Sequence, residues 1–263
     1  MVAEYADDIF EYMLELETKT MPNPRYMAQQ KELQWNMRGI LVDWLIDVHN
    51  RFQLLPETLF LTINLIDRFL SLRVVSLVKL QLVGITSMFI AAKYEEVMAP
   101  SIQNFIYMAD DGYKEEEVLR AERYMLQTID FNLSTPNPLN FLRRISKADD
   151  YDVQTRTVAK YLMEIPLVDH RLIDQPWSKI AAAAMYLARK MLNRGPWDVN
   201  LEHYSFYKEA ELLDIVDIMQ DYLSGAVKHE SLYKKYGDAK YFKASRYVRE
   251  WIRKNVSSGG GLA

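Results

Sequence analysis

ITSMFIAAK (residues 85–93) returns 97 positions later as AAAMYLARK (residues 182–190), and this pair of stretches decides the fold. Each stretch belongs to a segment that is apolar nearly all round, which is typical of a helix buried on every side. Small residues, among them Gly84 and Ala181–Ala184, would let neighbouring helices approach closely. A match this short can also arise by chance. Taken as a repeat, it predicts two similar helical units, each built around one buried helix.

Hydrophobic residues recur with a helical period on both sides of this repeat. The periodic segments are 4–17, 36–52, 56–72, 77–97, 101–109, 114–129, 138–148, 153–168, 176–193, 208–223 and 239–254. With only 9 Gly and 9 Pro among 263 residues, a turn-rich β protein is disfavoured. The sequence therefore predicts an all-α fold of two tandem five-helix repeats, with an additional helix at the N-terminus and another at the C-terminus.

The expected boundary between the repeats is Ser134-Thr135-Pro136-Asn137-Pro138, because two prolines two positions apart cannot lie inside one helix. Five parts are expected: an N-terminal docking helix and linker (1–35), a first unit (36–133), a linker (134–138), a second unit (139–236) and a C-terminal helix with a flexible tail (237–263). The composition of Ser257–Gly261 is typical of flexible linkers, which is why a tail is expected there.

Composition and missing motifs exclude several classes of protein. The net charge of −4 gives no global basic footprint for nucleic-acid binding. The absence of cysteine excludes disulfides and a thiol nucleophile, and it fits a reducing intracellular compartment. No apolar run reaches the roughly 20 residues that span a bilayer, and the acidic start lacks the features of a signal peptide. The four histidines are scattered, without HExxH, a Gly-rich phosphate loop or G-x-S-x-G, so we expect no metal, no cofactor and no catalytic site.

The helix expected at 36–52 carries two apolar stripes, although it needs only one for its own core. One stripe is Met37, Ile40, Leu41, Trp44 and Val48, and the other is Val42, Leu45 and Ile46 with Arg38 at its edge. Either the helix is fully buried, or one stripe is offered to a partner. A buried arginine needs a carboxylate, and Asp67 in the next helix is a natural one. If the two pair in the core, the stripe from Met37 to Trp44 points away from it.

Glu122 is a second anomaly, because it shares a helix face with apolar side chains such as Val118 and Leu126. A carboxylate in such a place is either paired inside the protein or placed at an interface. Lys93, at the end of the buried helix 77–97, is the candidate internal partner.

A third anomaly is basic. Arg143 and Arg144 lie on the first helix of the second unit, and Arg156 and Lys160 stand four apart on the next helix. Like charges at this spacing cost a few tenths of a kcal/mol. The arrangement indicates either a solvated basic face or a site for an anion.

Five motifs in order along residues 37–97 resemble the cyclin box. They are Met37–Leu45 (MRGILVDWL), Leu55–Leu59 (LPETL), Ile66–Leu70 (IDRFL), Lys79–Gly84 (KLQLVG) and Ala92–Glu96 (AKYEE). The stretch NPLNFLRRISKAD at 137–149 is similar to B-type mitotic cyclins, those of fungi in particular. The resemblance implies a regulatory subunit without an activity of its own, which binds and activates a mitotic cyclin-dependent kinase at the G2/M transition in the nucleus and cytoplasm.

The resemblance also implies where partners bind. Residues that match kinase contacts are Tyr5, Ile9, Lys93, Tyr94, Glu122, Leu126, Phe131 and Leu133. Residues that match the docking patch for substrates and inhibitors with short motifs are Met37, Ile40, Leu41, Trp44, Asp47 and Gln81. Positions that form a pocket for phosphorylated partners are matched by Arg143, Arg156 and Lys160, and Arg38 with Asp67 matches an internal ion pair.

Two other classes of protein remain as alternatives. One is a two-repeat helical transcription-factor core that binds DNA, against which the acidic net charge speaks. The other is a helical enzyme, for which the sequence offers no set of catalytic residues. We expect no nucleic-acid and no membrane partner.

Overall fold

The computed structural model describes residues 3–255, and this part of the chain contains thirteen α-helices, five short 3-10 helices and no strand. The all-α prediction is therefore confirmed for the described residues. The chain divides into two compact units, Met1–Asn137 and Pro138–Ala263. The predicted flexible tail at 256–263 lies outside the described residues.

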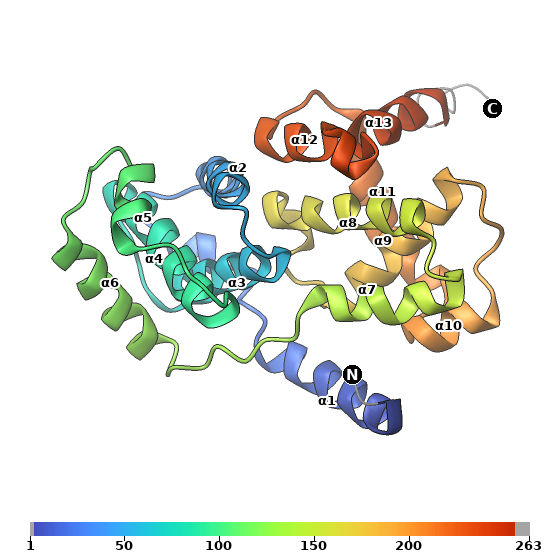
Figure 1. Cartoon of the computed structure of the whole chain (residues 1–263), viewed down its shortest axis with the longest axis horizontal. Helices are drawn as coiled ribbons and strands as arrows, with labels where there is room; N and C mark the ends of the chain where they lie inside the picture. Colours follow the sequence, from blue (N-terminus) through green and yellow to red (C-terminus); the bar gives the residue numbers. More distant parts are fainter. Residues whose placement is uncertain (1–2, 256–263) are drawn as a thin grey trace. The chain divides into compact units, whose positions relative to one another are not determined.

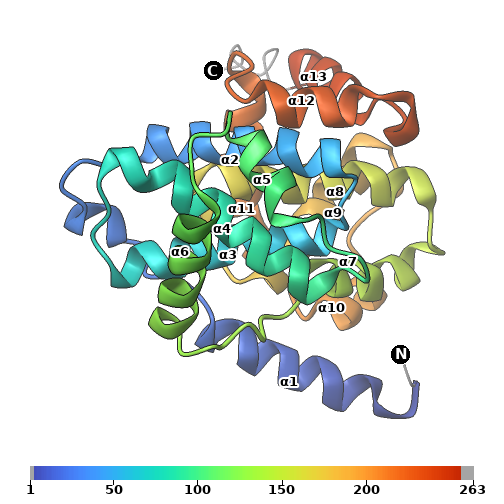
Figure 2. The same cartoon turned by 60° about the vertical axis from the view of Figure 1, so that its left-hand side comes forward.

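The first unit is a set of helices around one central helix (Figure 1). Its elements are η1 (Ala3–Tyr5), α1 (Ala6–Lys19), η2 (Tyr26–Gln29), α2 (Trp35–Phe52), α3 (Pro56–Leu72), α4 (Leu77–Glu95), α5 (Ile102–Met108) and α6 (Glu115–Thr128). Helix α4 contains the stretch ITSMFIAAK and packs against α2, α3, α5 and α6. Figure 2 brings α5 and α6 to the front of this unit. The central helix expected from the repeat is thus the one around which the unit is built.

Local sequence signals set where these helices begin. Helix α3 starts at Pro56, a residue that has no backbone donor to lose in a first turn. The carboxylate of Glu96 accepts hydrogen bonds from the Leu55 backbone N–H (2.7 Å) and the Thr58 hydroxyl (2.5 Å), so the segment after α4 caps the start of α3. The Ser101 hydroxyl accepts from the Asn104 backbone N–H at 3.4 Å and caps α5 in the usual way.

Gly84 fixes the contact between α2 and α4. A Cβ atom added to this residue would lie 2.8 Å from Cδ1 of Leu41, closer than real side chains approach. The missing side chain is therefore what lets Leu41 pack onto α4.

The second unit repeats this plan. Its elements are α7 (Pro138–Ser146), η3 (Lys147–Asp149), α8 (Val153–Val168), η4 (His170–Leu172), α9 (Trp177–Met191), α10 (Val199–Ser205), α11 (Glu209–Ser224), α12 (Glu230–Gly237), η5 (Ala239–Tyr241) and α13 (Ala244–Asn255). Helix α9 contains AAAMYLARK and packs against α7, α8, α10 and α11. The two similar stretches thus occupy the same place in the two units, which confirms the repeat.

The structure corrects the predicted secondary structure of the second unit at three places. Helices α10 and α12, of seven and eight residues, were not expected from the sequence, whereas α5, also of seven residues, was expected at 101–109. The helix expected at 239–254 begins only at Ala244. Its first residues form η5, and then Phe242 and Lys243 adopt positive φ angles of 52° and 54°, which interrupts the helix.

Helix α4 is long and apolar enough to cross a membrane by length and composition alone. However, 67% of its apolar window is buried inside the structure, as expected for the core helix of a globular unit.

Candidate functional site

A buried ion pair sets the orientation of α2. Arg38 donates hydrogen bonds to Asp67 on α3 from Nε to Oδ1 (2.6 Å) and from Nη2 to Oδ2 (2.7 Å). The Tyr26 hydroxyl on η2 donates to Asp67 Oδ1 at 2.9 Å. Arg38 is only 2% exposed, so the pair expected from the apolar stripe lies in the core. It joins α2, α3 and the segment that precedes α2.

Burial and the charge of Asp67 together shift the pKa values of Tyr26 and Arg38. Burial raises the pKa of Tyr26 far above its ordinary value, and the negative charge of Asp67 adds to the effect. Burial disfavours the charge on Arg38, yet the Asp67 carboxylate more than offsets this, so the pKa of Arg38 is raised. Arg38 is therefore a permanent cation inside the first unit.

With Arg38 turned inward, part of the neighbouring stripe faces solvent. Ile40 is 68% exposed, and Met37 and Trp44 are half-buried. Leu41, which was predicted for the same docking patch, is only 7% exposed because it packs against Gly84.

Two polar residues were predicted to extend this docking patch. Asp47 is half-buried and forms an ion pair with Arg51 one turn later on α2 (2.9 Å). Gln81 is exposed on α4, where its Oε1 accepts a hydrogen bond from the Tyr113 hydroxyl at 3.2 Å. We define the α2 face as Met37, Ile40, Trp44, Asp47 and Gln81.

Lys93 at the end of α4 and Glu122 on α6 form an ion pair, so the carboxylate in the apolar stripe has an internal partner. The Lys93 side chain is 43% exposed and the Glu122 side chain 11% exposed. The Lys93 ammonium also lies 4.1 Å from the centre of the Phe89 ring, where a cation is favoured. The pair is thus accessible from one side only, through the lysine.

Apolar side chains that could meet a partner lie on the same elements. Tyr94 follows Lys93 and is exposed, and Leu126 on α6 is half-buried. Phe131 is 64% exposed in the turn after α6, held there by a hydrogen bond from its backbone N–H to the Leu126 carbonyl (2.8 Å). Leu133 is half-buried just beyond. We define the α4–α6 surface as Lys93, Tyr94, Glu122, Leu126, Phe131 and Leu133.

The remaining predicted residues lie on other elements. Tyr5 is exposed in η1, and Ile9 is half-buried in the first turn of α1. Arg143 is exposed on α7 and donates a hydrogen bond to Asn140 Oδ1 at 3.3 Å. Arg156 and Lys160 are half-buried on α8, which packs against α7. The three cations thus belong to two neighbouring helices of one unit.

Sequence reasoning missed two exposed apolar residues. Val97 and Met98 lie between α4 and α5 and are both exposed. The available signal was two consecutive apolar residues between Glu96 and Pro100, the first of which the sequence placed at the end of the periodic segment 77–97. They follow Glu95, whose pKa is raised by burial and by the nearby carboxylates of Glu57 and Glu96.

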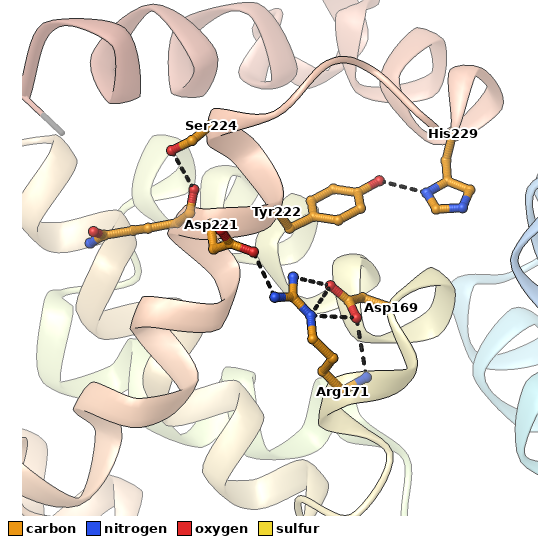
Figure 3. A network of polar contacts seen from close by, with 7 residues as sticks. Asp169, Arg171, Asp221, Tyr222, Ser224 and His229 are labelled. Atoms are coloured by element: carbon orange, nitrogen blue, oxygen red, sulfur yellow. Dashed lines mark hydrogen bonds and ion pairs between the residues drawn. The ribbon is translucent and has the colours of Figure 1, made fainter. Parts of the chain in front are cut away.

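The second unit contains an ion-pair network that the sequence did not predict (Figure 3). Arg171 donates to Asp169 from Nε (3.1 Å) and Nη2 (2.7 Å), and from Nη1 to Asp221 on α11 (2.6 Å). Burial alone would raise the pKa of Asp169, but the hydrogen bonds from Arg171 outweigh burial and hold this pKa below its ordinary value. The network fastens the segment between α8 and α9 to α11.

Comparison with known families and proteins gives consistent matches. The models of the cyclin N-terminal domain and the cyclin C-terminal domain match residues 8–134 and 136–250. The G2/mitotic-specific cyclin cdc13 of Schizosaccharomyces pombe is 66% identical over 255 residues, which are 97% of this chain and 53% of that protein. The G2/mitotic-specific cyclin-B of Emericella nidulans is 58% identical over 254 residues, with the same two coverages. The chain thus spans about half the length of these relatives.

Among solved structures, a viral cyclin from herpesvirus saimiri superimposes with a TM-score of 0.73 at 20% identity, over 87% of this chain and 99% of that one. The yeast RNA polymerase II CTD kinase complex CTDK-1 contains a chain that matches with a TM-score of 0.63 at 13% identity, over 95% of this chain and 83% of that one. At such identities the likeness concerns the fold.

Proposed function

Because the chain belongs to the cyclin family, we propose that it is a regulatory subunit that binds and activates a mitotic cyclin-dependent protein kinase and recruits that kinase's substrates at the G2/M transition. It acts in the nucleus and cytoplasm and has no catalytic activity of its own. The two relatives named as G2/mitotic-specific cyclins support the mitotic assignment.

The observation that carries the proposal is the α4–α6 surface. Exposed aromatic rings beside a partly exposed ion pair are typical of a protein interface, in which apolar side chains surround a few specific polar contacts. Lys93 has hydrogen-bond donors beyond the one that it gives to Glu122, since an ammonium carries three. A kinase helix laid across this surface would bury the aromatic rings and accept a hydrogen bond from the lysine.

Activation would be a shift between two kinase conformations. In kinases an ion pair between a lysine and the C helix must form for activity, and displacement of that helix breaks the pair. A surface that binds only the active position of the helix shifts the equilibrium by its difference in affinity for the two states. This requires a rigid surface, and α4 meets the requirement because four helices surround it.

The test compares two lysines of the same helix. Lys93 pairs with Glu122, and Lys79 pairs with Glu117 at 3.5 Å, so both lysines join α4 to α6. Lys93→Ala should weaken kinase binding by about 2–5 kcal/mol, because it removes one partner of a charged contact that binding would bury. Lys79→Ala is the matched control and should leave binding and activation unchanged. Equal activation by both folded variants would exclude the α4–α6 surface as the kinase site.

The α2 face supports recruitment of substrates and inhibitors that carry short docking motifs. Ile40 and the half-buried Met37 and Trp44 would receive apolar side chains, while Asp47 would meet a basic residue of the motif. The Asp47–Arg51 ion pair is exposed, so a basic ligand residue can replace Arg51 at little cost. Holding the substrate here raises its local concentration at the kinase.

A second site for phosphorylated substrates is proposed at Arg143, Arg156 and Lys160. The packing of α7 against α8 supports it, since the cations then belong to adjacent helices. A phosphate would relieve the repulsion between Arg156 and Lys160, and guanidinium groups suit phosphate oxygens because two parallel hydrogen bonds can form. A substrate phosphorylated once would then return to the same kinase for further phosphorylation.

A further inference from the structure

Positive charge is concentrated at the C-terminal end of the described chain. Residues 228–255 carry nine lysines and arginines against three carboxylates, in a chain whose net charge is −4. The cations are Lys228, Lys234, Lys235, Lys240, Lys243, Arg246, Arg249, Arg253 and Lys254, and the carboxylates are Glu230, Asp238 and Glu250. The remaining residues therefore carry a net negative charge, whereas this C-terminal segment carries a net positive charge.

The segment is fastened to the second unit by a buried ion pair. Glu164 on α8 accepts two hydrogen bonds from the Lys235 ammonium (2.7 and 2.8 Å) and one from the Tyr236 hydroxyl (2.7 Å). Both charged side chains are almost fully buried. At the start of α12, the Tyr222 hydroxyl on α11 is hydrogen-bonded to Nδ1 of His229 at 2.9 Å, as Figure 3 shows. Helix α12 is therefore held at both ends, and α13 packs against it.

Lys235 is used for this attachment, so it does not belong to the exposed positive surface. Lys234 pairs with Glu230 on α12 at 2.6 Å. Arg249 donates to the Gly225 carbonyl at 2.8 Å. Of the cations exposed to solvent, Lys240 and Lys243 precede α13, and Arg246, Arg253 and Lys254 lie on α13, where Glu250 is also exposed. We define the α13 face as Lys240, Phe242, Lys243, Arg246 and Arg253, all of them exposed.

Phe242 gives this positive surface an apolar centre. It is 57% exposed and lies between two lysines in sequence. Its φ angle of 52° and that of Lys243 at 54° are in the left-handed region, which is unfavourable for a side-chain-bearing residue. The Lys243 backbone N–H donates to the Asp238 carbonyl at 3.1 Å and holds the turn.

We propose that the α13 face binds an acidic segment of a protein substrate, one that carries carboxylates around an aromatic or large aliphatic side chain. The substrate part of this inference rests on the proposed function. Opposite charge brings the segment to the surface, and the ring of Phe242 contacts its apolar side chain. Helix α13 has twelve residues and is about 18 Å long, which matches five or six residues of extended peptide.

A peptide fits better than a nucleic acid for two reasons. The chain as a whole has a net charge of −4, which disfavours association with a long polyanion. In addition, the positive surface has the length of one short helix, whereas nucleic-acid binding of useful affinity needs many phosphate contacts.

The test measures binding to the full chain without any kinase. The probe is a fluorescein-labelled peptide with five glutamates around one phenylalanine, and its twin has glutamine in place of each glutamate. Fluorescence anisotropy at low salt should show at least tenfold tighter binding of the glutamate peptide, with weaker binding as salt rises. Arg246→Glu combined with Arg253→Glu should weaken binding of the glutamate peptide about tenfold. Phe242→Ser should weaken both peptides.

The matched control reverses two exposed lysines elsewhere, Lys31→Glu with Lys190→Glu, and should change binding less than twofold. Equal binding of the glutamate peptide to wild type and to the Arg246/Arg253 variant would overturn the proposal. So would tighter binding of a labelled single-stranded DNA 15-mer at the same face, which would assign it to nucleic acid. No kinase is present in this assay, so a negative result leaves the kinase proposal standing. Conversely, the result of the kinase-activation test with Lys93→Ala leaves the proposal for the α13 face standing.

Discussion

Replacing Arg38 with alanine should cost the first unit about 3–5 kcal/mol of unfolding free energy, because the change leaves the buried Asp67 carboxylate without its cation. Three hydrogen bonds satisfy that carboxylate in the wild type, two from Arg38 and one from Tyr26. Only the Tyr26 hydroxyl would remain. At roughly 2–4 °C per kcal/mol for a chain of this size, the midpoint of thermal unfolding should fall by roughly 6–20 °C.

Thermal unfolding followed by tryptophan fluorescence is the assay, since Trp35 and Trp44 both lie on α2 beside the substitution. Arg51→Ala on the same helix is the control. Its ion pair with Asp47 has a similar N···O distance of 2.9 Å but is exposed, so its loss should cost at most about 1 kcal/mol. If Arg38→Ala lowers the midpoint no more than Arg51→Ala does, the reasoning from burial is refuted.

A double variant separates the charge from the packing. Arg38→Met combined with Asp67→Leu removes both buried charges at once, and replacing a buried ion pair by apolar side chains is often close to neutral. It should recover much of the stability lost in Arg38→Ala. Recovery should be incomplete, because the Tyr26 hydroxyl then lacks its acceptor, which costs about 1–3 kcal/mol.

Three further outcomes are expected. Ile40→Ala with Trp44→Ala should reduce phosphorylation of substrates that carry a docking motif several-fold and spare a short peptide, whereas equal losses would mean that these side chains serve the fold. Alanine at all three cations of the proposed phosphate site should abolish only the preference for a singly phosphorylated peptide over its unphosphorylated twin, and a wild type without that preference would contradict the site. Because the pKa of Asp169 is lowered in the folded chain, its pairing with Arg171 stabilises the second unit fully above about pH 4 and is lost as the pH falls through the folded pKa. The urea midpoints of wild type and Asp169→Asn should therefore differ at pH 7 and converge as the pH falls through the folded pKa of Asp169, and a constant difference would rule this out.

The sequence predicted those parts of the fold in which a pattern is long or a residue is out of place. Helices α4 and α9 each contain a long run without a charged residue, Leu80–Ala92 and Ile180–Ala188, and Arg38 stands out on an apolar stripe. The burial of Leu41 could not be predicted, because helical periodicity says which residues share a face but not which neighbouring helix has a glycine to receive one of them.

The ion pair of Glu164 and Lys235 could not be predicted for a related reason. Lys235 is one of nine cations in a basic segment, so nothing in the sequence distinguishes it from a solvated lysine. Helix α12, which carries it, is too short to show an apolar period that would indicate its buried side. The candidate surfaces depend on which side chains remain exposed once all the helices have packed, and the sequence contains that information only indirectly.

The two buried carboxylates limit which fragments of the protein can fold. Asp67 and Glu164 are 97 residues apart, the same offset as the repeated stretches, yet their hydrogen-bond donors come from opposite directions along the chain. Asp67 is satisfied from upstream by Tyr26 and Arg38, and Glu164 from downstream by Lys235 and Tyr236. A fragment that began after Tyr26 or stopped before Lys235 would keep a buried carboxylate while losing a donor to it. The shortest fragments of either half that remain folded are therefore expected to extend beyond the five helices, to residue 26 at one end and residue 236 at the other.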